Sequence, residues 1–529
     1  MRKFFACLFL WGCIFPVIYA VAGTGTATGT ATGTGTVAAT SGVAQRLPSP
    51  SAGAAPQAGV YHVDIQRGDD GNSGSAAEPW ASLEKARRTL KGPATVMVHP
   101  GTYPRFEEYK NPGRKGYLKF KAAPGSKPRV LGITLTYGDP TDSYLSFHGF
   151  DIYSEDSLRI VEVRDAQKVE LLHSEIHSDH WARGPNDGVY GINLMDSRDV
   201  RIERNKFYEV YRGVLVRNSH EVAIRHNYIS VKGASAILYM SGSSNGLIEY
   251  NHITGETFTP YPQDPLAVDK PHQSMIAISS NDLVVRGNIM HGIGNSSGVM
   301  LYYLGNKREK GMAYRNILFE GNAIYDPINR YAFRIYHLGE NIVLRNNFFY
   351  ANKREGDCDG GSADARYRYN VAIAVHSIAD GYDGSGLELY NNIFLGAAMF
   401  PEEVTEQGNV FWSLQLGKDW QRQAFSKRSE VIVGDFMGCG RHPKLMEDGS
   451  FFAVQNDLSF PTASLMDLTL SRNSLARRLL VPEQLPQAFP GAVEDSGFLQ
   501  APIPRDSVAM PSIGPWQRAH DAARPAAQR

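Results

Sequence analysis

Residues 200–207 (VRIERNKF) and 222–229 (VAIRHNYI) share the pattern apolar-x-apolar-x-x-Asn-x-apolar. The same unit recurs as LVVRGNIM (283–290), ILFEGNAI (317–324), IVLRNNFF (342–349) and LELYNNIF (387–394). Looser copies are LSFHGFDI (145–152), VELLHSEI (169–176) and GLIEYNHI (246–253), and in the second of these Ser174 stands in the asparagine place. A unit that recurs in phase is typical of a repeat architecture.

The spacing between the asparagines indicates which kind of repeat this is. Asn205 and Asn227 are 22 residues apart, and Asn251 follows 24 residues later. These short intervals correspond to one bare coil, and the longer ones, 37 residues to Asn288 and 34 to Asn322, to coils that carry loops. Short strands with one turn asparagine per coil predict a parallel β-helix, because Asn tolerates the left-handed backbone conformation and can bond to the Asn of the next coil.

A second series of apolar strands precedes the asparagine units. Its members are YGINLMDS (190–197), RGVLVRNS (212–219), SAILYMSG (235–242), SMIAISSN (274–281), GVMLYYLG (298–305), AFRIYHLG (332–339) and VAIAVHSI (371–378). Stacked coil on coil, these strands should form one parallel sheet with aliphatic residues inside. Alternation counted back from the asparagines predicts that the outward residues are Asn193, Met195, Leu215, Arg217, Tyr239, Ser241, Tyr302, Arg334 and Tyr336.

The composition limits the classes of partner. Lys and Arg total 54, as do Asp and Glu, so the formal net charge is zero. No global basic field is present that would attract nucleic acid or an anionic membrane. The 52 glycines, and 26 tyrosines against 24 phenylalanines, favour strands, turns and sugar-facing surfaces over a helical bundle.

The N-terminal region predicts export. Residues 1–22 combine two basic residues, an apolar run and Ala20-Val21-Ala22, the pattern of a signal peptide cleaved after Ala22. The alternative is an uncleaved membrane anchor, since the apolar run approaches spanning length. No second apolar stretch is long enough to span a bilayer, so we expect a secreted or periplasmic protein without stable membrane insertion.

Four further regions follow the signal peptide. Residues 23–58, rich in Gly, Thr, Ala and Pro, predict a flexible linker. Residues 59–140 should hold an N-terminal cap and the first strands, residues 141–415 the β-helix repeats, and residues 416–529 a closing segment and irregular tail. The predicted cap contains one amphipathic helix whose apolar stripe consists of Trp80, Leu83, Ala86 and Leu90.

The cysteines do not form a scaffold. Cys7 and Cys13 lie in the signal peptide and leave with it, whereas Cys358 and Cys439 remain in the mature chain. In an oxidising compartment these two can pair, but their spacing does not decide whether they do.

The segment from Tyr61 to Tyr103, which includes YHVDIQRGDDGNSGSAAEPWASLEKA and VMVHPGTY, resembles the entry segment of secreted right-handed β-helix proteins of the pectate-lyase-like superfamily. The units over about residues 140–410 are similar to that superfamily's coils. The resemblance implies an all-β, right-handed parallel β-helix solenoid with an N-terminal helical cap. It leaves the activity open, because the superfamily includes lyases, hydrolases, uronate epimerases and non-catalytic surface proteins.

A narrower resemblance concerns residues 269–273 (DKPHQ). They are faintly similar to the aspartate-proline-histidine-aspartate motif of mannuronan C5-epimerases and related lyases. The match is incomplete, since Lys270 is inserted and Gln273 replaces the last aspartate.

In a solenoid, function tends to lie in the loops that interrupt the period. The long insertions are residues 177–190, 254–273, 304–316 and 350–370, which we expect to wall a groove along the outward Arg and Tyr residues. Such a groove suits an acidic polysaccharide, because guanidinium and ammonium groups neutralise carboxylates and aromatic rings pack on sugar rings. The expected substrate-binding residues are Trp181, Arg183, Tyr336, His337, Lys307 and Arg308.

The favoured reaction is β-elimination from a uronate. This reaction needs a neutralised carboxylate, a base for the C5 proton and an acid for the leaving oxygen. The candidate bases are Lys270 and His272, the acids Tyr239 and Tyr302, and the neutralisers Arg217 and Arg334.

Three alternatives remain open at the level of sequence. They are a uronate C5-epimerase, a glycoside hydrolase, which needs two carboxylates, and a non-catalytic exopolysaccharide-binding or surface protein. Carboxylates for hydrolysis are available at Asp179, Asp187, Asp196, Asp264 and Asp269.

No cofactor is required by these patterns, but calcium is a candidate because hard oxygen ligands attract it. Asp179 and Asp187 with Asn186, or residues 357–364 (DCDGGSAD), would supply the oxygens. We expect an acidic polysaccharide as partner, no nucleic acid, and a monomer.

Overall fold

The computed structural model describes residues 59–110, 112–155, 158–179, 182–184, 187–255, 274–291, 297–302, 314–325, 331–336, 339–350, 371–375, 386–395, 397–399, 403–407, 409–413 and 430–433. All of them belong to one compact unit, Gln45–Arg529. The predicted signal peptide, the whole linker, and both Cys358 and Cys439 lie outside the described residues. Among the described residues, no helix is long and apolar enough to cross a membrane.

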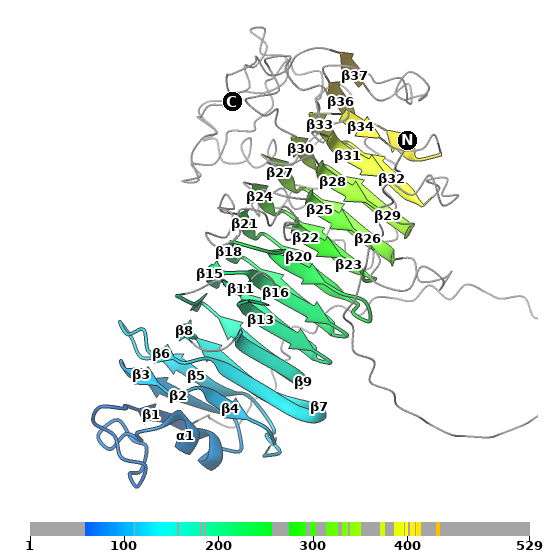
Figure 1. Ribbon diagram of the computed structural model, residues 1–529. Helices are drawn as coiled ribbons and strands as arrows, with labels where there is room; N and C mark the ends of the chain where they lie inside the picture. The colour runs from blue at the N-terminus through cyan, green and yellow to red at the C-terminus, as the bar shows by residue number, and fades with distance from the viewer. Residues whose placement is uncertain are drawn as a thin grey trace, which may run out of the picture. The chain divides into compact units, whose positions relative to one another are not determined.

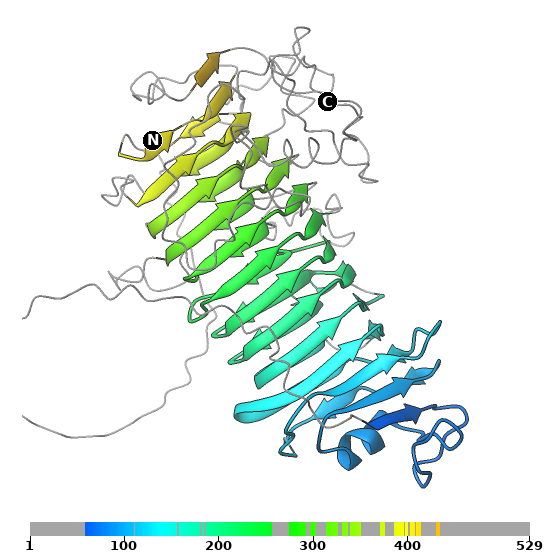
Figure 2. The same cartoon turned by 180° about the vertical axis from the view of Figure 1, so that it is seen from behind.

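Each complete coil consists of three short strands. One coil contains β13 (Tyr190–Met195), β14 (Arg198–Glu203) and β15 (Lys206–Val210), and the next contains β16 (Arg212–Arg217), β17 (His220–Arg225) and β18 (Tyr228–Val231). Each strand pairs in parallel with its counterpart one coil later, as β13 does with β16. The expected all-β parallel solenoid is therefore confirmed, and Figures 1 and 2 show its coils stacked in chain order from the blue to the yellow strands.

Three faces run along the stack. The first face contains β13, β16, β19 (Ile237–Tyr239), β22 (Ser274–Ile278), β25 (Ser297–Leu301), β28 (Tyr331–Ile335), β31 (Val371–Val375) and β34 (Ala397–Met399). The second face contains β14, β17, β20 (Gly246–Glu249), β23 (Leu283–Arg286), β26 (Tyr314–Glu320), β29 (Gly339–Arg345), β32 (Leu387–Tyr390) and β35 (Thr405–Gln407). The third face contains β3 (Thr102–Tyr103), β6 (Arg129–Val130), β8 (Asp151–Tyr153), β10 (Glu175–His177), β15, β18, β21 (His252–Gly255), β24 (Ile289–His291), β27 (Ala323–Tyr325), β30 (Phe348–Tyr350), β33 (Ile393–Leu395), β36 (Val410–Ser413) and β37 (Glu430–Val433).

The N-terminal coils are less regular. They contain β1 (Gly59–Val63), β2 (Ala94–Val98), β4 (Phe106–Glu108), β5 (Leu118–Ala122), β7 (Ile133–His148) and β9 (Arg159–Leu172). Strand β9 pairs with both β13 and β14, so one long strand serves two faces there. A small antiparallel hairpin, β11 (Ala182–Gly184) with β12 (Asp187–Gly188), precedes β13.

The predicted helix is present as α1 (Leu83–Thr89), with the Ser82 hydroxyl accepting from the backbone N–H of Lys85 at its N-terminus. Its predicted apolar stripe, Trp80, Leu83, Ala86 and Leu90, is buried. Just before the helix, the backbone of Trp80 exchanges hydrogen bonds with His62 and Asp64 at the end of β1.

The core consists of inward side chains that stack on their equivalents one coil away. On the first face, Ile192, Val214, Ile237, Ile276, Val299 and Phe333 form one such row. Further along the chain, the ring of Phe394 stacks on those of Phe349 and Phe411, with 5.0 Å between centroids in each case. Burial of these rows is the main favourable term in the folding of each coil.

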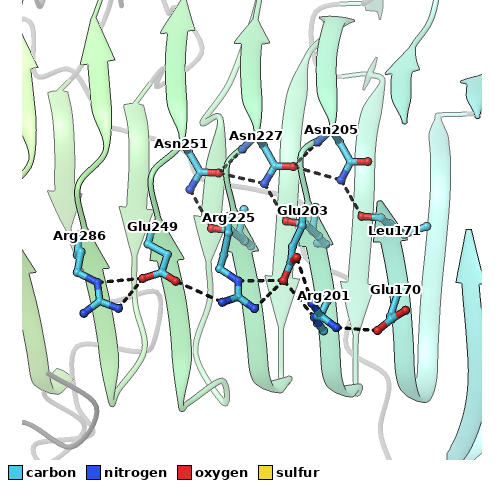
Figure 3. A network of polar contacts seen from close by, with 12 residues as sticks. Glu170, Leu171, Arg201, Glu203, Asn205, Arg225, Asn227, Glu249, Asn251 and Arg286 are labelled. Atoms are coloured by element: carbon cyan, nitrogen blue, oxygen red, sulfur yellow. Dashed lines mark hydrogen bonds and ion pairs between the residues drawn. The ribbon is translucent and has the colours of Figure 1, made fainter. Parts of the chain in front are cut away.

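The predicted asparagine ladder is confirmed (Figure 3). In each rung the backbone N–H and the side-chain amide of one Asn donate to Oδ1 of the Asn in the next coil, as Asn205 does to Asn227 at 2.9 and 3.2 Å. The side-chain amide also donates to a backbone carbonyl of the preceding coil. Ser174 occupies the asparagine place, as predicted, and its N–H donates to Oδ1 of Asn205.

One detail of the predicted turn is wrong. The left-handed backbone conformation belongs to the residue before the ladder Asn, such as Arg204, His226 or Tyr250, which have φ of 56°, 54° and 54°. In the doubled units, Asn346 and Asn391 take the positive φ, whereas Asn347 and Asn392 form the ladder. The ladder residue needs its own N–H directed along the stack, and the left-handed residue turns the chain to place it there.

Candidate functional site

Four of the predicted site residues lie on the outward side of the first face. Arg217 is exposed at the end of β16, and Arg334 lies in β28. Tyr302 and Tyr336 follow β25 and β28, and both are half-buried. The strand register brings Arg217, Tyr302 and Tyr336 into one row along the stack, as the sequence predicts.

The structure corrects the predicted direction of the Tyr239 side chain. Its side chain is 0 % exposed and belongs to the inward row with Val216 and Ile278. The neighbouring outward residues are Leu238 and Met240. The predicted role of Tyr239 as an acid at the surface is therefore wrong.

Most of the predicted loop residues lie outside the described part of the chain. These are Lys270, His272, Trp181, Lys307, Arg308 and His337, together with Asp264, Asp269 and residues 357–364. For Arg183 and Asp187 the structure describes the backbone, in β11 and β12, but not the side chain. The catalytic and binding roles expected for these residues stay predictions.

A second outward row, which the sequence reasoning missed, lies at the start of the same strands. Tyr190 and Arg212 are paired in register and are half-buried. A Cβ on the intervening residue Gly191 would lie 2.8 Å from the ring of Phe207, a core residue, so Gly191 faces inward. Because Gly191 and Ile192 both face inward, simple alternation fails here and Tyr190 faces outward.

Two arginines of the first face, Arg212 and Arg334, lie over tyrosine rings. The guanidinium of Arg334 lies 4.5 Å from the ring centroid of Tyr331 and 3.8 Å from that of Tyr336. The guanidinium of Arg212 lies 5.1 Å from the ring centroid of Tyr190. Contact with a ring face restricts the orientation of a guanidinium.

An apolar row lies between the two outward rows. Leu215, Leu238, Ala277 and Met300 are successive members in register, and each is buried although it faces away from the core. Met240, Tyr302 and Tyr336 pack against them. Burial raises the pKa of the Tyr302 hydroxyl, against an opposing effect of the Arg212 charge, so this tyrosine keeps its proton at neutral pH.

The charge on the second face is balanced, with arginine and glutamate alternating along the stack (Figure 3). Arg225 bonds to Glu203 at 2.9 Å and Arg286 to Glu249 at 2.9 Å. Each of these arginines lies beside an acidic partner, so this part of the second face presents little net charge to a ligand.

The first face differs in charge. No Asp or Glu occurs in β13, β16, β19, β22, β25 or β28. Arg212 and Arg217 form no ion pair with any residue that the structure describes. Among the described residues, Arg212 and Arg217 therefore give the first face a positive charge that no acidic side chain compensates.

A polar cluster on the third face also escaped the sequence reasoning. Nε2 of His177 lies 2.7 Å from Oδ1 of Asp151, and Nε of Arg129 donates to Oδ2 of the same carboxylate. Burial raises the pKa of Asp151, but these hydrogen bonds outweigh it and lower the pKa overall. Asp151 and His177 lie one and three places after the ladder positions of their coils, which Phe150 and Ser174 occupy, but the sequence gives no signal that joins them across coils.

The calcium candidates are only partly described. Asp179 is exposed and accepts a hydrogen bond from the Tyr153 hydroxyl at 2.6 Å. Within the described residues, no group of three or more His, Cys, Asp or Glu side chains is placed to hold a metal ion.

A comparison with protein families identifies the coil type. A family model described as the right handed beta helix region matches residues 145–260. The described coils form a right-handed parallel β-helix. The right-handed parallel β-helix expected from the repeats is thereby confirmed.

Solved structures similar to this right-handed β-helix include several enzymes. The pectate lyase Pel9A is 13% identical, with 87% of this chain and 96% of that chain covered and a TM-score of 0.46. The A-module of the Azotobacter vinelandii mannuronan C-5 epimerase AlgE6 is 16% identical, with 62% and 93% covered and a TM-score of 0.40. A rhamnogalacturonan lyase is 11% identical, with 75% and 91% covered and a TM-score of 0.35. A search of curated proteins finds no match to the sequence.

Proposed function

We propose that this protein is an exported β-helix that binds an acidic polysaccharide on its first face and cleaves it by β-elimination at a uronate. The observation that carries the proposal is the contrast between two faces of one solenoid. Arg225 and Arg286 on the second face are matched by glutamates, whereas Arg212 and Arg217 on the first face have no acidic partner among the described residues. Guanidinium groups without an acidic partner, of which Arg212 also lies over the ring of Tyr190, favour a ligand with carboxylates.

The rest of the first face supports a sugar ligand over a simple anion. Tyr302 and Tyr336, which are half-buried and pack against the apolar row, offer ring faces to the C–H groups of pyranose rings. A ligand with both carboxylates and apolar ring faces matches both features, and uronate polymers have both.

Elimination would use these groups as follows. A guanidinium, from Arg217 or Arg334, neutralises the uronate carboxylate so that the C5 proton becomes more acidic. A base removes that proton, the C4–O bond breaks, and a C4=C5 double bond forms as the leaving oxygen takes a proton from an acid. Tyr302, which keeps its proton and lies in the same row as Arg217, is our candidate acid. Lys270 or His272 is our candidate base.

The reaction is tested on the purified mature chain with alginate, pectate, hyaluronan and chondroitin. A rise in ultraviolet absorbance marks the unsaturated uronate and supports elimination. New reducing ends without that absorbance would show hydrolysis, and exchange of the C5 proton without cleavage would show an epimerase. Binding without any of these changes would show a non-catalytic exopolysaccharide-binding protein.

Two variants test the assignment of the site. Arg217→Ala combined with Lys270→Ala should abolish turnover without unfolding the chain, and unchanged turnover would move the site elsewhere. Arg198→Met is the matched control, because Arg198 is an exposed arginine on the second face whose ion pair with Glu221 contributes little to stability.

We also propose how the protein is exported, how its core is capped and that it is a monomer, and we give a test for a calcium requirement. The signal peptide is cleaved after Ala22, which the N-terminal sequence of the exported protein would verify. Helix α1 caps the core, so Leu83→Asp should destabilise the first coils. The mature protein is a monomer, which light scattering would test, and activity that survives a chelator would exclude calcium as a requirement.

A further inference from the structure

Two histidines of the first two coils contact each other through their ring nitrogens. Nδ1 of His62 lies 3.1 Å from Nε2 of His99, and the ring centroids are 5.4 Å apart, so the two nitrogens lie between the rings. His62 belongs to β1 and His99 directly follows β2, the neighbouring strand at the blue end of the solenoid (Figure 1). The contact therefore joins the first coil to the second.

Both imidazoles are on the outer side of the sheet. The neighbouring residues Val63 and Val98 are fully buried in the core, and alternation places His62 and His99 on the opposite side, where both are half-buried. A small solute can reach them there. The imidazole of His291, which has a similar contact further along the chain, is by contrast buried.

The backbone on both sides of the contact is fixed by hydrogen bonds. The N–H of His99 donates to the carbonyl of Val63 at 2.9 Å, and the N–H of His62 donates to the carbonyl of Gly74 at 2.8 Å. The carbonyl of His62 also accepts from the N–H of Trp80 at 3.0 Å. Two side chains on such a fixed backbone lose little freedom when they bind one ligand together.

The separation of the two nitrogens suits a shared metal ion. Zn²⁺ binds an imidazole nitrogen at about 2.0–2.1 Å, so two such bonds at about 90–110° place the nitrogens roughly 2.9–3.4 Å apart. The observed 3.1 Å lies within this range. The proton between the two rings can move through solvent to the outer nitrogen of its own ring, and a modest rotation of the rings then directs both lone pairs at one ion.

The donor set indicates which class of ion would bind. Burial and the neighbouring His99 lower the pKa of His62, so its imidazole is neutral at neutral pH, the form that ligates metals. Imidazole suits zinc, copper and nickel, whereas calcium and magnesium need oxygen ligands. The nearby carboxylate of Asp64 is already bonded to Arg67. Since no group of three ligating side chains exists among the described residues, water would complete the coordination.

We propose that His62 and His99 form a binding site for a divalent first-row transition-metal ion, which links the first coil of the solenoid to the second. A terminal coil has a neighbour on one side only, and an ion that binds only the paired arrangement stabilises that coil. The site lies on the N-terminal coils and does not depend on the proposed function.

The test titrates the chelator-treated mature chain with Cu²⁺, Ni²⁺ and Zn²⁺ by calorimetry. We expect one tight site per chain, with Cu²⁺ bound more tightly than Ni²⁺ or Zn²⁺. His62→Gln and His99→Gln should each weaken Cu²⁺ binding by at least tenfold. The electron paramagnetic resonance spectrum of the copper-loaded parent should show nitrogen ligands, and each variant should lose this signature.

The matched control is His148→Gln with His173→Gln. These two rings are also neighbours, with 4.6 Å between centroids, and this variant should keep the tight site. Copper should raise the melting temperature of the parent and the control but not of His62→Gln, whose unfolding without metal shows that it is folded. Tight copper binding that survives both single variants, an equal loss in the control, or no tight binding by the parent would each overturn the inference.

Discussion

Asn227 donates twice to Asn251: its backbone N–H and its side-chain amide both reach Oδ1 of Asn251, each at 3.0 Å. Its own Oδ1 accepts the corresponding two bonds from Asn205. Replacing Asn227 by Leu would leave buried groups unpaired on both sides of the coil. We expect Asn227→Leu to lower the free energy of unfolding by roughly 3–6 kcal/mol, measured by urea denaturation.

The control for that variant is the residue before it. His226 has a φ of 54°, and His226→Gly removes the strain of a left-handed residue without touching the ladder. Its free energy of unfolding should stay within about 1 kcal/mol of the parent. A similar loss in both variants would show that the turn conformation, and not the ladder bonds, determines the stability of the coil.

The buried pair Glu108 and Arg114 gives a second prediction. Nη1 of Arg114 donates to Glu108 at 2.7 Å, the Tyr137 hydroxyl donates to the same carboxylate at 2.6 Å, and both charged side chains are buried. Glu108→Ala leaves the buried charge of Arg114 without its partner and should lower the free energy of unfolding by about 3–5 kcal/mol. The double variant Glu108→Leu, Arg114→Met should recover most of that loss in thermal unfolding. Failure to recover would mean that the pair is net stabilising.

The imidazoles of His252 and His291 give a pH dependence. Their Nε2 atoms are 2.8 Å apart on neighbouring third-face strands. Burial lowers the pKa of both, and with the His252 charge it lowers the pKa of His291 from 6.5 to about 4. The unfolded chain therefore binds the proton more readily, so stability is complete above about pH 6.5 and is lost as the pH falls toward 4.

The size of that loss follows from the shift. For His291 it should approach about 3 kcal/mol. Unfolding measured at a series of pH values should show the loss in the parent. The double variant His252→Phe, His291→Phe should show less of it, and an unchanged pH profile would assign the effect to other groups.

Tyr239 provides a direct check of the corrected side-chain direction. Its hydroxyl is buried in the core and finds no hydrogen-bond partner among the described residues. Tyr239→Phe should therefore leave turnover unchanged and should not lower the melting temperature. Loss of turnover in this variant, with Tyr302→Phe active, would restore Tyr239 as the acid.

The sequence carries the coil pattern more clearly than the direction of each side chain. The ladder asparagines could be found because each is the same residue type at the same place in its unit. Tyr239 was assigned to the wrong side because the corner after β19 has one residue more than the corner after β16, as the pairing of His220 with Ser244 shows. Because side chains alternate between the two sides of a strand, one extra residue at the corner reverses the side predicted for each residue before it.

The site was harder to predict than the fold for two physical reasons. Gly191 and Ile192 both face inward, so the alternation of side chains is interrupted at the start of the strand. Alternation alone therefore did not predict that Tyr190 and Arg212 face outward. The cluster of Asp151 and His177 joins residues of neighbouring coils, and nothing in the local sequence of either strand indicates the partner.

The uniform ladder has a consequence for how the length of this protein can change. Asn205 and Asn227 have the same bonds and are 22 residues apart. Deleting residues 206–227 would bring Tyr228 directly after Asn205. Asn205 would then donate to Oδ1 of Asn251, as Asn227 does in the parent protein. The solenoid can thus lose or gain whole turns by deletion or duplication of the residues from one ladder position to the next, while a deletion that removes only part of a coil would break both the ladder and the inward rows.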